Sequence, residues 1–281
     1  DLHSFPTRRS SDLWSYVIGW RGILAVVAGF TGMLVLMVAL WVPESLPAER
    51  RHDGGMRILL DGTRELARDH VLVRLLLINA LAFGLLMAYL SAAPFVLRNV
   101  LGMGTAPYTA VFGLCGATVT VTIAVAASLV RRFPQTRQVR VGLLTGLVVD
   151  VVLAAVCLVR LRGPVDGPER MPLLVVVIAL LLVHVVCLGL SMGNVPAIAL
   201  DRTGRWAGTG SALLGFIQFV VGGLVSPLVG LTGEASGAAF GVVVVALGVV
   251  ANALAAFGVG DDDAARSEEH TSELQSLGAI S

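Results

Sequence analysis

Four polar side chains able to do chemistry lie near the middle of long apolar segments of this sequence. They are the amides of Asn79 and Gln218, the carboxyl group of Asp150 and the imidazole of His184. Ionisable and polar groups are costly at the depth of a bilayer, so they face a bundle interior or a water-filled cavity. The amides could bind a ligand by hydrogen bonds, and the acid and the imidazole could carry a proton. Each could equally form a hydrogen bond between helices, and both interpretations stay open at this point.

Gln218 belongs to a stripe of small and polar residues. Ser211, Gly215, Gln218, Gly222 and Ser226 are spaced by four, three, four and four positions, which places them on one face of a helix. Such a stripe lets neighbouring helices approach closely, with the amide bonding across the interface. Alternatively, it lines a cavity in which Gln218 meets water or a ligand.

Asn79 begins a comparable face. Phe83, Met87 and Leu90 follow it at helical spacing. Polar, aromatic and flexible side chains together accommodate varied apolar ligands. Thr118 and Thr122, one turn apart in another apolar segment, are a weaker candidate for a site because threonine often bonds its own helix backbone.

The composition is that of a helical membrane protein with several spans. The chain has 281 residues, of which 56% are hydrophobic and 14% charged, and its mean hydropathy is +0.85. A soluble domain carries about 25% charged residues. Apolar runs of about 20 residues, the length that crosses the hydrocarbon core, recur along the chain.

Enzymatic motifs are absent from the sequence. The three cysteines lie in apolar runs without metal-ligand spacing, and no P-loop, haem-type histidine pair, GxSxG or HExxH motif occurs. We therefore expect no enzyme activity, no cofactor, no metal and no nucleic-acid partner.

Seven spans are predicted, and the loops between them differ in charge. Loops 44–70, 131–140 and 194–206 carry most of the arginines, and the sequence contains no lysine. The positive-inside rule then places these loops and the C-terminus in the cytoplasm of a cell whose cytoplasmic (inner) membrane holds the spans. The predicted spans are 20–42, 71–96, 105–130, 141–160, 171–193, 207–231 and 237–259.

Loop 44–70 is the longest. Its second half, MRILLDGTRELARDH, mixes apolar residues with regularly placed charges. This pattern predicts a short amphipathic helix on the cytoplasmic face.

Both ends of the sequence look foreign to the protein. Residues 1–13 resemble one reading frame of a common sequencing-library adapter, and residues 266–281 resemble the partner adapter followed by an index. We expect the native chain to cover about 14–265, with 261–265 as a cytoplasmic tail, and to continue beyond both of these limits.

Three sequence stretches resemble the major facilitator superfamily of transporters. GWRGILAVVAGF at 19–30 with WVPESLPAERR at 41–51 resembles the sixth helix and the start of the central loop. AYLSAAPFVLRNVLGMG at 88–104 and WAGTGSALLGFIQFVVGGLVSPLVGL at 206–231 resemble the seventh and eleventh helices of its Bcr/CflA drug-resistance branch.

The resemblance implies an all-α fold that forms the C-terminal half of a twelve-helix protein. Residues 14–43 would be the last helix of the N-terminal bundle, 44–70 the central loop and 71–260 the C-terminal six-helix bundle. The resemblance also implies an exporter of drugs or small hydrophobic metabolites that is driven by the proton gradient and works by alternating access. The implied partners are the lipid bilayer, a small-molecule substrate and the missing N-terminal helices.

The resemblance also sorts the polar residues. The seventh and eleventh helices of this fold approach the substrate cavity and the ninth is peripheral, which favours Asn79 and Gln218 over Asp150. Asp150 and His184 are kept as a possible proton or polar relay. The residues expected in the substrate cavity are Asn79, Phe83, Met87, Gln218, Phe219 and Gly222.

Two alternatives stay open. A membrane subunit of a redox or proton-pumping complex would require haem or quinone ligands, or several acids and lysines along the spans. The chain as it stands could also be an inactive truncated fragment of a transporter.

Overall fold

The computed structural model describes residues 10–42, 55–232 and 237–256, and every regular element in them is helical. The chain divides into two compact units at residue 54, and each unit is described by itself. The predicted adapter segment 266–281, the tail 261–265 and residues 1–9 of the other adapter segment lie outside the described residues.

The first unit contains one long helix. Helix α1 (Ser10–Trp41) includes the candidate span Leu24–Trp41, in agreement with the predicted span 20–42. The apolar side chains of this span are exposed within the unit, including Leu24, Phe30 and Trp41. A helix that is apolar all round requires burial in lipid or against other helices.

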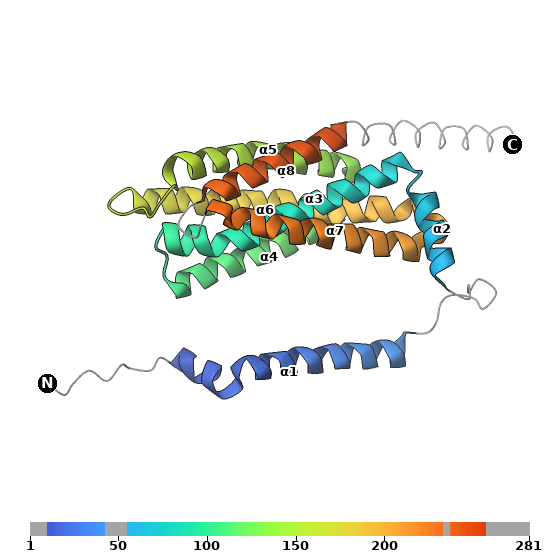
Figure 1. The fold of residues 1–281 in the computed structure, drawn as a ribbon, viewed down its shortest axis with the longest axis horizontal. Coiled ribbons are helices and arrows are strands. Elements are labelled where there is room, and N and C mark those ends of the chain that lie inside the picture. Colours follow the sequence, from blue (N-terminus) through green and yellow to red (C-terminus); the bar gives the residue numbers. More distant parts are fainter. Residues whose placement is uncertain (1–9, 43–54, 233–236, 257–281) are drawn as a thin grey trace, which may run out of the picture. The chain divides into compact units, whose positions relative to one another are not determined.

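The second unit is a bundle of long helices preceded by a short one (Figure 1). Apolar runs form helices in a membrane because a helix satisfies every backbone polar group within the segment. The elements are α2 (Met56–Leu66), α3 (His70–Ala93), η2 (Pro94–Val100), α4 (Thr105–Leu129), α5 (Gln135–Arg160), α6 (Arg170–Asp201), η3 (Gly204–Trp206), α7 (Ala207–Val229), η4 (Gly230–Thr232) and α8 (Ala238–Ala256).

The amphipathic segment of loop 44–70 forms α2. This helix buries Gly62 and Leu66 and packs against α7. Its polar side chains, including Arg64 and Glu65, stay exposed. The helix predicted from the mixture of charged and apolar residues therefore exists, with its buried side against the bundle.

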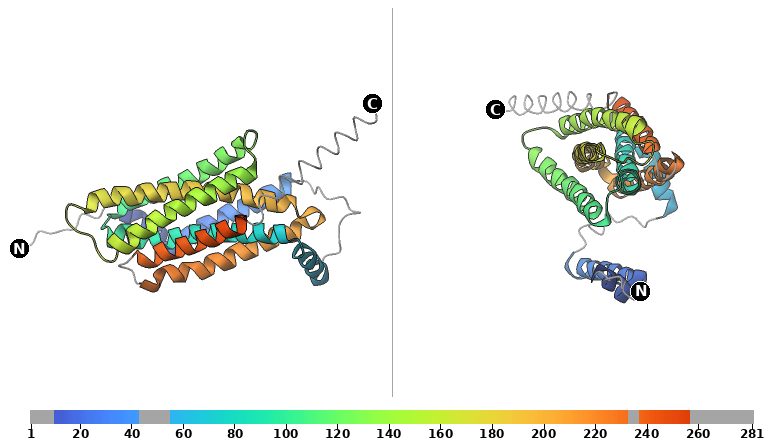
Figure 2. Two further views of the ribbon diagram at one scale, coloured as in Figure 1. Left: turned by 90° about the horizontal axis from the view of Figure 1, so that it is seen from above. Right: turned by 90° about the vertical axis from the view of Figure 1, so that its left-hand side faces the viewer.

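Two helices form the centre of the bundle. Helix α3 packs against α6, α7 and α8, and α6 packs against α3, α4 and α5. The end-on view in Figure 2 shows the remaining helices around them. Side chains on the inner faces of α3 and α6, such as Leu72, Ile78 and Val185, are consequently fully buried.

The seams between helices depend on small residues. Gly142 and Gly146 of α5 face Cys187 of α6, and a Cβ built on Gly142 would lie 3.0 Å from the Cys187 carbonyl oxygen. This GxxxG spacing allows two helix backbones to approach closely in a membrane.

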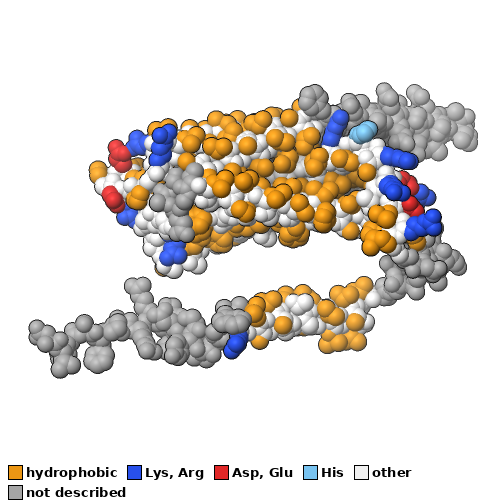
Figure 3. Space-filling model, in the orientation of Figure 1, with side chains coloured by type: hydrophobic (Ala, Val, Ile, Leu, Met, Phe, Trp, Pro, Cys, Tyr) orange, Lys and Arg blue, Asp and Glu red, His pale blue; other side chains and the backbone are white. Residues whose placement is uncertain are grey.

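The face of the bundle shown in Figure 3 is largely apolar, and its charges gather at the two ends. Across both units, the described chain contains seven helices that are long and apolar enough to cross a membrane, as predicted. A multi-pass membrane protein has this distribution because the hydrocarbon core contacts the sides of the bundle.

The prediction of a loop at 194–206 is wrong for the first half of that range. Helix α6 continues to Asp201, past the predicted end at residue 193, and contains Pro196. Helix α5 likewise begins at Gln135, six residues before the predicted start. Hydropathy marks only the part of a helix within the hydrocarbon, whereas packing stabilises the polar extensions of both helices. Gln138 and Asn194 are buried there and bond each other, with 3.3 Å between Nδ2 of Asn194 and Oε1 of Gln138.

Candidate functional site

The two amides singled out in the sequence bond each other across the seam between α3 and α7. Nδ2 of Asn79 donates to Oε1 of Gln218 at 3.0 Å. Asn79 is buried, with 2% of its surface exposed, whereas Gln218 is half-buried. The bond satisfies both groups in an apolar setting and ties α3 to α7 at the middle of their lengths.

Aromatic and flexible side chains flank this amide pair. The rings of Phe83 and Phe219 meet edge to face, with centroids 5.1 Å apart. Gly222 lies against Phe83 and Met87, since a Cβ added to it would lie 2.8 Å from Cγ of Met87 and 2.9 Å from Cε1 of Phe83. All six residues expected in the substrate cavity therefore lie along one contact between α3 and α7. Their role in binding stays a prediction.

Two of the five residues in the predicted stripe on α7, Gln218 and Gly222, form that contact. Gly222 is buried, while a Cβ on Gly215 would meet no atom within 4 Å. Ser211 and Ser226 donate to carbonyl oxygens of their own helix, at Gly208 and Gly222 respectively. The stripe therefore packs against α3 at Gln218 and Gly222 and leaves open space beside Gly215.

Asp150 and His184 bond each other, which the sequence did not indicate. Oδ1 of Asp150 in α5 lies 2.6 Å from Nδ1 of His184 in α6, and each residue is 1% exposed. From the sequence, a bond between helices is one of the two interpretations of each position taken alone. The structure unites them in a single bond at the seam between α5 and α6.

Thr118 and Thr122 behave as structural residues. Their hydroxyl groups donate to the carbonyl oxygens of Leu114 and Thr118 in the same helix, at 2.8 Å each. Thr122 also packs against Gly189 of α6. The three cysteines are buried and free, as small apolar residues would be.

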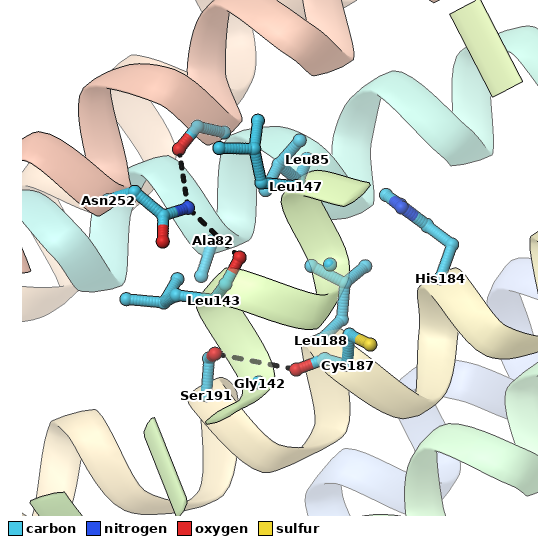
Figure 4. Close-up of a pocket in the computed structure, with 12 residues that line it drawn as sticks. Ala82, Leu85, Gly142, Leu143, Leu147, His184, Cys187, Leu188, Ser191 and Asn252 are labelled. Atoms are coloured by element: carbon cyan, nitrogen blue, oxygen red, sulfur yellow. Dashed lines mark hydrogen bonds between the residues drawn. The ribbon is translucent and has the colours of Figure 1, made fainter. Parts of the chain in front are cut away.

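Asn252 is a polar residue that the sequence reasoning missed. Its Nδ2 donates to the carbonyl oxygen of Leu143 at 2.9 Å and to that of Gly248 at 2.8 Å, which joins α8 to α5 (Figure 4). The sequence does mark this residue, because Asn252 is an isolated amide in an apolar span, like Gln218.

Charged contacts hold the α2 end of the bundle. Oδ2 of Asp69 lies 3.1 Å from Nε of Arg202, and the carboxylate of Glu65 accepts two bonds from Arg205 at 2.7 and 3.0 Å. Burial disfavours the ionised form of Asp69, but bonds from the Leu72 N–H and from Arg202 outweigh it and hold its pKa below the usual range. The bond from Arg205 likewise lowers the pKa of Glu65.

Comparison with known proteins identifies the family. The family model described as Major Facilitator Superfamily matches residues 12–227, which is most of the chain. The chain belongs to the major facilitator superfamily. It is also 25% identical over 244 residues to the "Uncharacterized MFS-type transporter YdgK" of Bacillus subtilis (strain 168).

The alignment with YdgK covers 85% of this chain and 56% of YdgK, so the chain spans about half the length of that relative. No solved structure gives a significant match. Membership of a transporter superfamily, together with seven candidate spans, agrees with the expectation that the chain is not an enzyme. It also contradicts the alternative of a redox-complex subunit.

Proposed function

We propose that this chain is part of a proton-coupled exporter of drugs or small hydrophobic metabolites, of the Bcr/CflA branch, which works by alternating access. The observation that carries the proposal is the amide pair Asn79–Gln218 beside the aromatic pair Phe83–Phe219. An amphiphilic substrate needs a few hydrogen-bonding groups set among apolar surfaces, and these four side chains supply both.

The exposure of the contact favours binding over packing alone. Gln218 is only half-buried and Phe219 is 66% exposed, although Asn79 beside them is buried. The site is thus open on the α7 side, where a substrate or the remaining helices of the transporter would meet it. Met87 adds a flexible, polarizable surface that accepts ligands of different shapes.

The proposed orientation follows from the arginines. The α2 end of the described bundle carries more arginines than the opposite end. Those at the α2 end include Arg131, Arg132, Arg202 and Arg205, whereas those at the opposite end are Arg98, Arg160, Arg162 and Arg170. The positive-inside rule favours a cytoplasmic α2 end in the cytoplasmic membrane.

Transport by the full-length protein that contains this chain tests the proposal. Cells expressing it should accumulate less of several hydrophobic dyes and drugs than cells with an empty vector, and should tolerate higher doses. Equal accumulation and equal tolerance across the panel would refute export. The present chain alone is expected to be inactive, because it spans about half the length of its relative.

Variants test the site itself. Gln218→Ala and Asn79→Ala should change the substrate range and reduce export of the best substrates about tenfold, which corresponds to ~1.4 kcal/mol of transition-state binding. Thr118→Val is the matched control because that hydroxyl bonds only its own helix among the contacts described. If Gln218→Ala and Thr118→Val transport equally well at equal expression, Gln218 serves packing.

A further inference from the structure

Asp150 and His184 form a buried pair that the proposed substrate site does not use. Their 2.6 Å contact lies between α5 and α6, whereas the amide pair lies between α3 and α7. Asp150 is near the middle of α5, so the pair lies at the depth of the hydrocarbon.

No other charged residue of the described helices around the pair lies at its depth. Within the described α3, α5, α6 and α8, every arginine and every other acid lies in the first or last two turns of its helix. The groups facing the pair from neighbouring turns are neutral. Cys187 of α6 is the nearest titratable one, α8 contributes Gly248 and Asn252, and α3 contributes Ala82 and Leu85.

The net charge of the pair therefore depends on one proton. A carboxylate beside a neutral imidazole carries a net charge of −1, and adding one proton makes the pair neutral overall. An uncompensated buried charge is strongly destabilising, whereas a neutral pair retains its hydrogen bond without that penalty. Loss of the additional proton would therefore leave a net charge inside the packed seam between α5 and α6.

A small cavity lies beside His184. The cavity has a volume of about 20 Å³ and is lined by His184, Cys187, Ser191 and Asn252, among others (Figure 4). That volume holds one water molecule. Nε2 of His184 is buried and has no hydrogen-bond partner within the described part of the chain, although polar atoms that are buried normally have one.

We propose that Asp150 and His184 are a one-proton site that exchanges through a single water molecule in this cavity. On release, the Nε2 proton passes to the water and on to the solvent. The imidazole stays neutral with its Nδ1–H directed at the Asp150 carboxylate, and the net charge of the pair falls from zero to −1. Proton uptake reverses these steps.

Proton loss is expected to loosen the seams of α5, because a net charge favours entry of water between the helices. The same seams hold Gly142 against Cys187 and Asn252 against Leu143. This coupling to the movement of helices rests on the proposed transport function, whereas the protonation itself does not.

Magnetic resonance of the full chain in lipid nanodiscs, labelled with ¹⁵N-histidine and ¹³C-aspartate, tests the protonation. His184→Gln identifies the imidazole signals, and Asp150→Asn identifies the carboxyl signal. At neutral pH the pair should hold its additional proton, either as imidazolium with carboxylate or as neutral imidazole with protonated carboxyl. Carboxylate beside neutral imidazole throughout neutral and mildly acidic pH would overturn the proposal.

Asp150→Asn separates protonation from packing. The Asn amide oxygen can still accept the Nδ1–H bond, so a purely structural pair would tolerate it and leave the charge of His184 unchanged. If the wild-type proton makes His184 an imidazolium, the one-proton site instead predicts that the imidazole becomes neutral in Asp150→Asn, and an imidazolium that persists would overturn the proposal. If the proton resides on the carboxyl group, or if Asp150→Asn does not fold, the carboxyl signal of Asp150 is read in His184→Gln. A protonated carboxyl group is expected there, and a carboxylate would overturn the proposal.

The transport arm uses the full-length protein in vesicles. Asp150→Asn should abolish transport driven by a pH gradient while retaining substrate exchange without a gradient. Unchanged gradient-driven transport would overturn the coupling. If the wild type transports no tested compound but the pair holds its proton in the spectra, the transport proposal fails and the proton site stands.

Discussion

The carboxylate of Asp69 connects the start of α3 to Arg202, just beyond the end of α6. Its Oδ1 accepts the backbone N–H groups of Val71 and Leu72 at 3.0 and 3.1 Å, and its Oδ2 lies 3.1 Å from Nε of Arg202. One side chain therefore caps a helix and forms an ion pair with a distant segment. The two central helices of the bundle are joined at this end.

Substituting Asp69 tests both roles. Asp69→Ala should lower the stability of the chain by ~1 kcal/mol through loss of the cap, with an added loss from the ion pair. Asp69→Asn keeps the cap and removes only the ion pair, so it should be less harmful. Thermal unfolding of the two variants in detergent compares them, and equal losses would contradict the separate roles.

The same ion pair predicts a dependence of stability on pH. The pKa of Asp69 is lowered in the folded state, so its contribution is present above the ordinary carboxyl pKa of about 4 and is lost as pH falls below that value. The stability difference between wild type and Asp69→Asn should therefore shrink on acidification below about pH 4. A difference that grows at low pH would contradict this sign.

Gly222 should not tolerate a larger side chain. A methyl group there would lie 2.8 Å from Met87 and 2.9 Å from Phe83, so Gly222→Ala should cost ~1–3 kcal/mol through overpacking. Gly215→Ala is the control on the same helix, because it would meet no atom within 4 Å. Thermal unfolding should rank the two variants in this order, and equal stability would contradict the close packing of α3 on α7.

Helix α2 should be held by packing more than by its ion pair. Gly62→Ala would place a methyl group 2.7 Å from the ring of Trp206 and should detach α2 from α7. Glu65→Gln should change little, because the Glu65–Arg205 pair is exposed and such pairs contribute little. Hydrogen exchange over residues 56–66 should accelerate in the first variant only. Faster hydrogen exchange in Glu65→Gln alone would show that the ion pair holds α2 more strongly than packing does.

Asn252 should make a small, measurable contribution to the contact between α5 and α8. Asn252→Leu removes the 2.9 Å bond to Leu143 and should cost ~0.6 kcal/mol, the average for hydrogen bonds between membrane helices. Thr120→Val is the comparison, since that hydroxyl bonds the Gly116 carbonyl of its own helix. Thermal stability in detergent measures both, and equal values would show that the bond between helices adds nothing.

The sequence predicted the number and approximate position of the spans because the hydrocarbon imposes one length and one composition on each. It also selected Asn79, Gln218, Asp150 and His184 as unusual, since a polar group in an apolar run stands out regardless of its partner. Which of them bond each other could not be predicted. Pairing depends on the rotation of each helix about its axis and on the order of helices in the bundle.

The ends of the helices were the least predictable feature. The bond between Gln138 and Asn194 supports helical turns that hydropathy does not detect, because those residues are polar. Gly142 and Gly146 could have indicated the close seam of α5, since GxxxG is readable in a sequence. Its partner, the face of α6 around Cys187, could not be deduced from that motif.

Helix α6 is longer than the hydrocarbon core is thick, so its parts lie in two different environments. Its 32 residues span ~48 Å, whereas the hydrocarbon core is ~30 Å thick, so about a third of the helix lies among headgroups or in water. The contact of Asp69 with Arg202 lies just beyond that outer part, and the bond of Asp150 with His184 lies at the depth of the hydrocarbon. Ionic strength should therefore change the strength of the contact between Asp69 and Arg202. The chain length of the surrounding lipids should change that of the bond between Asp150 and His184.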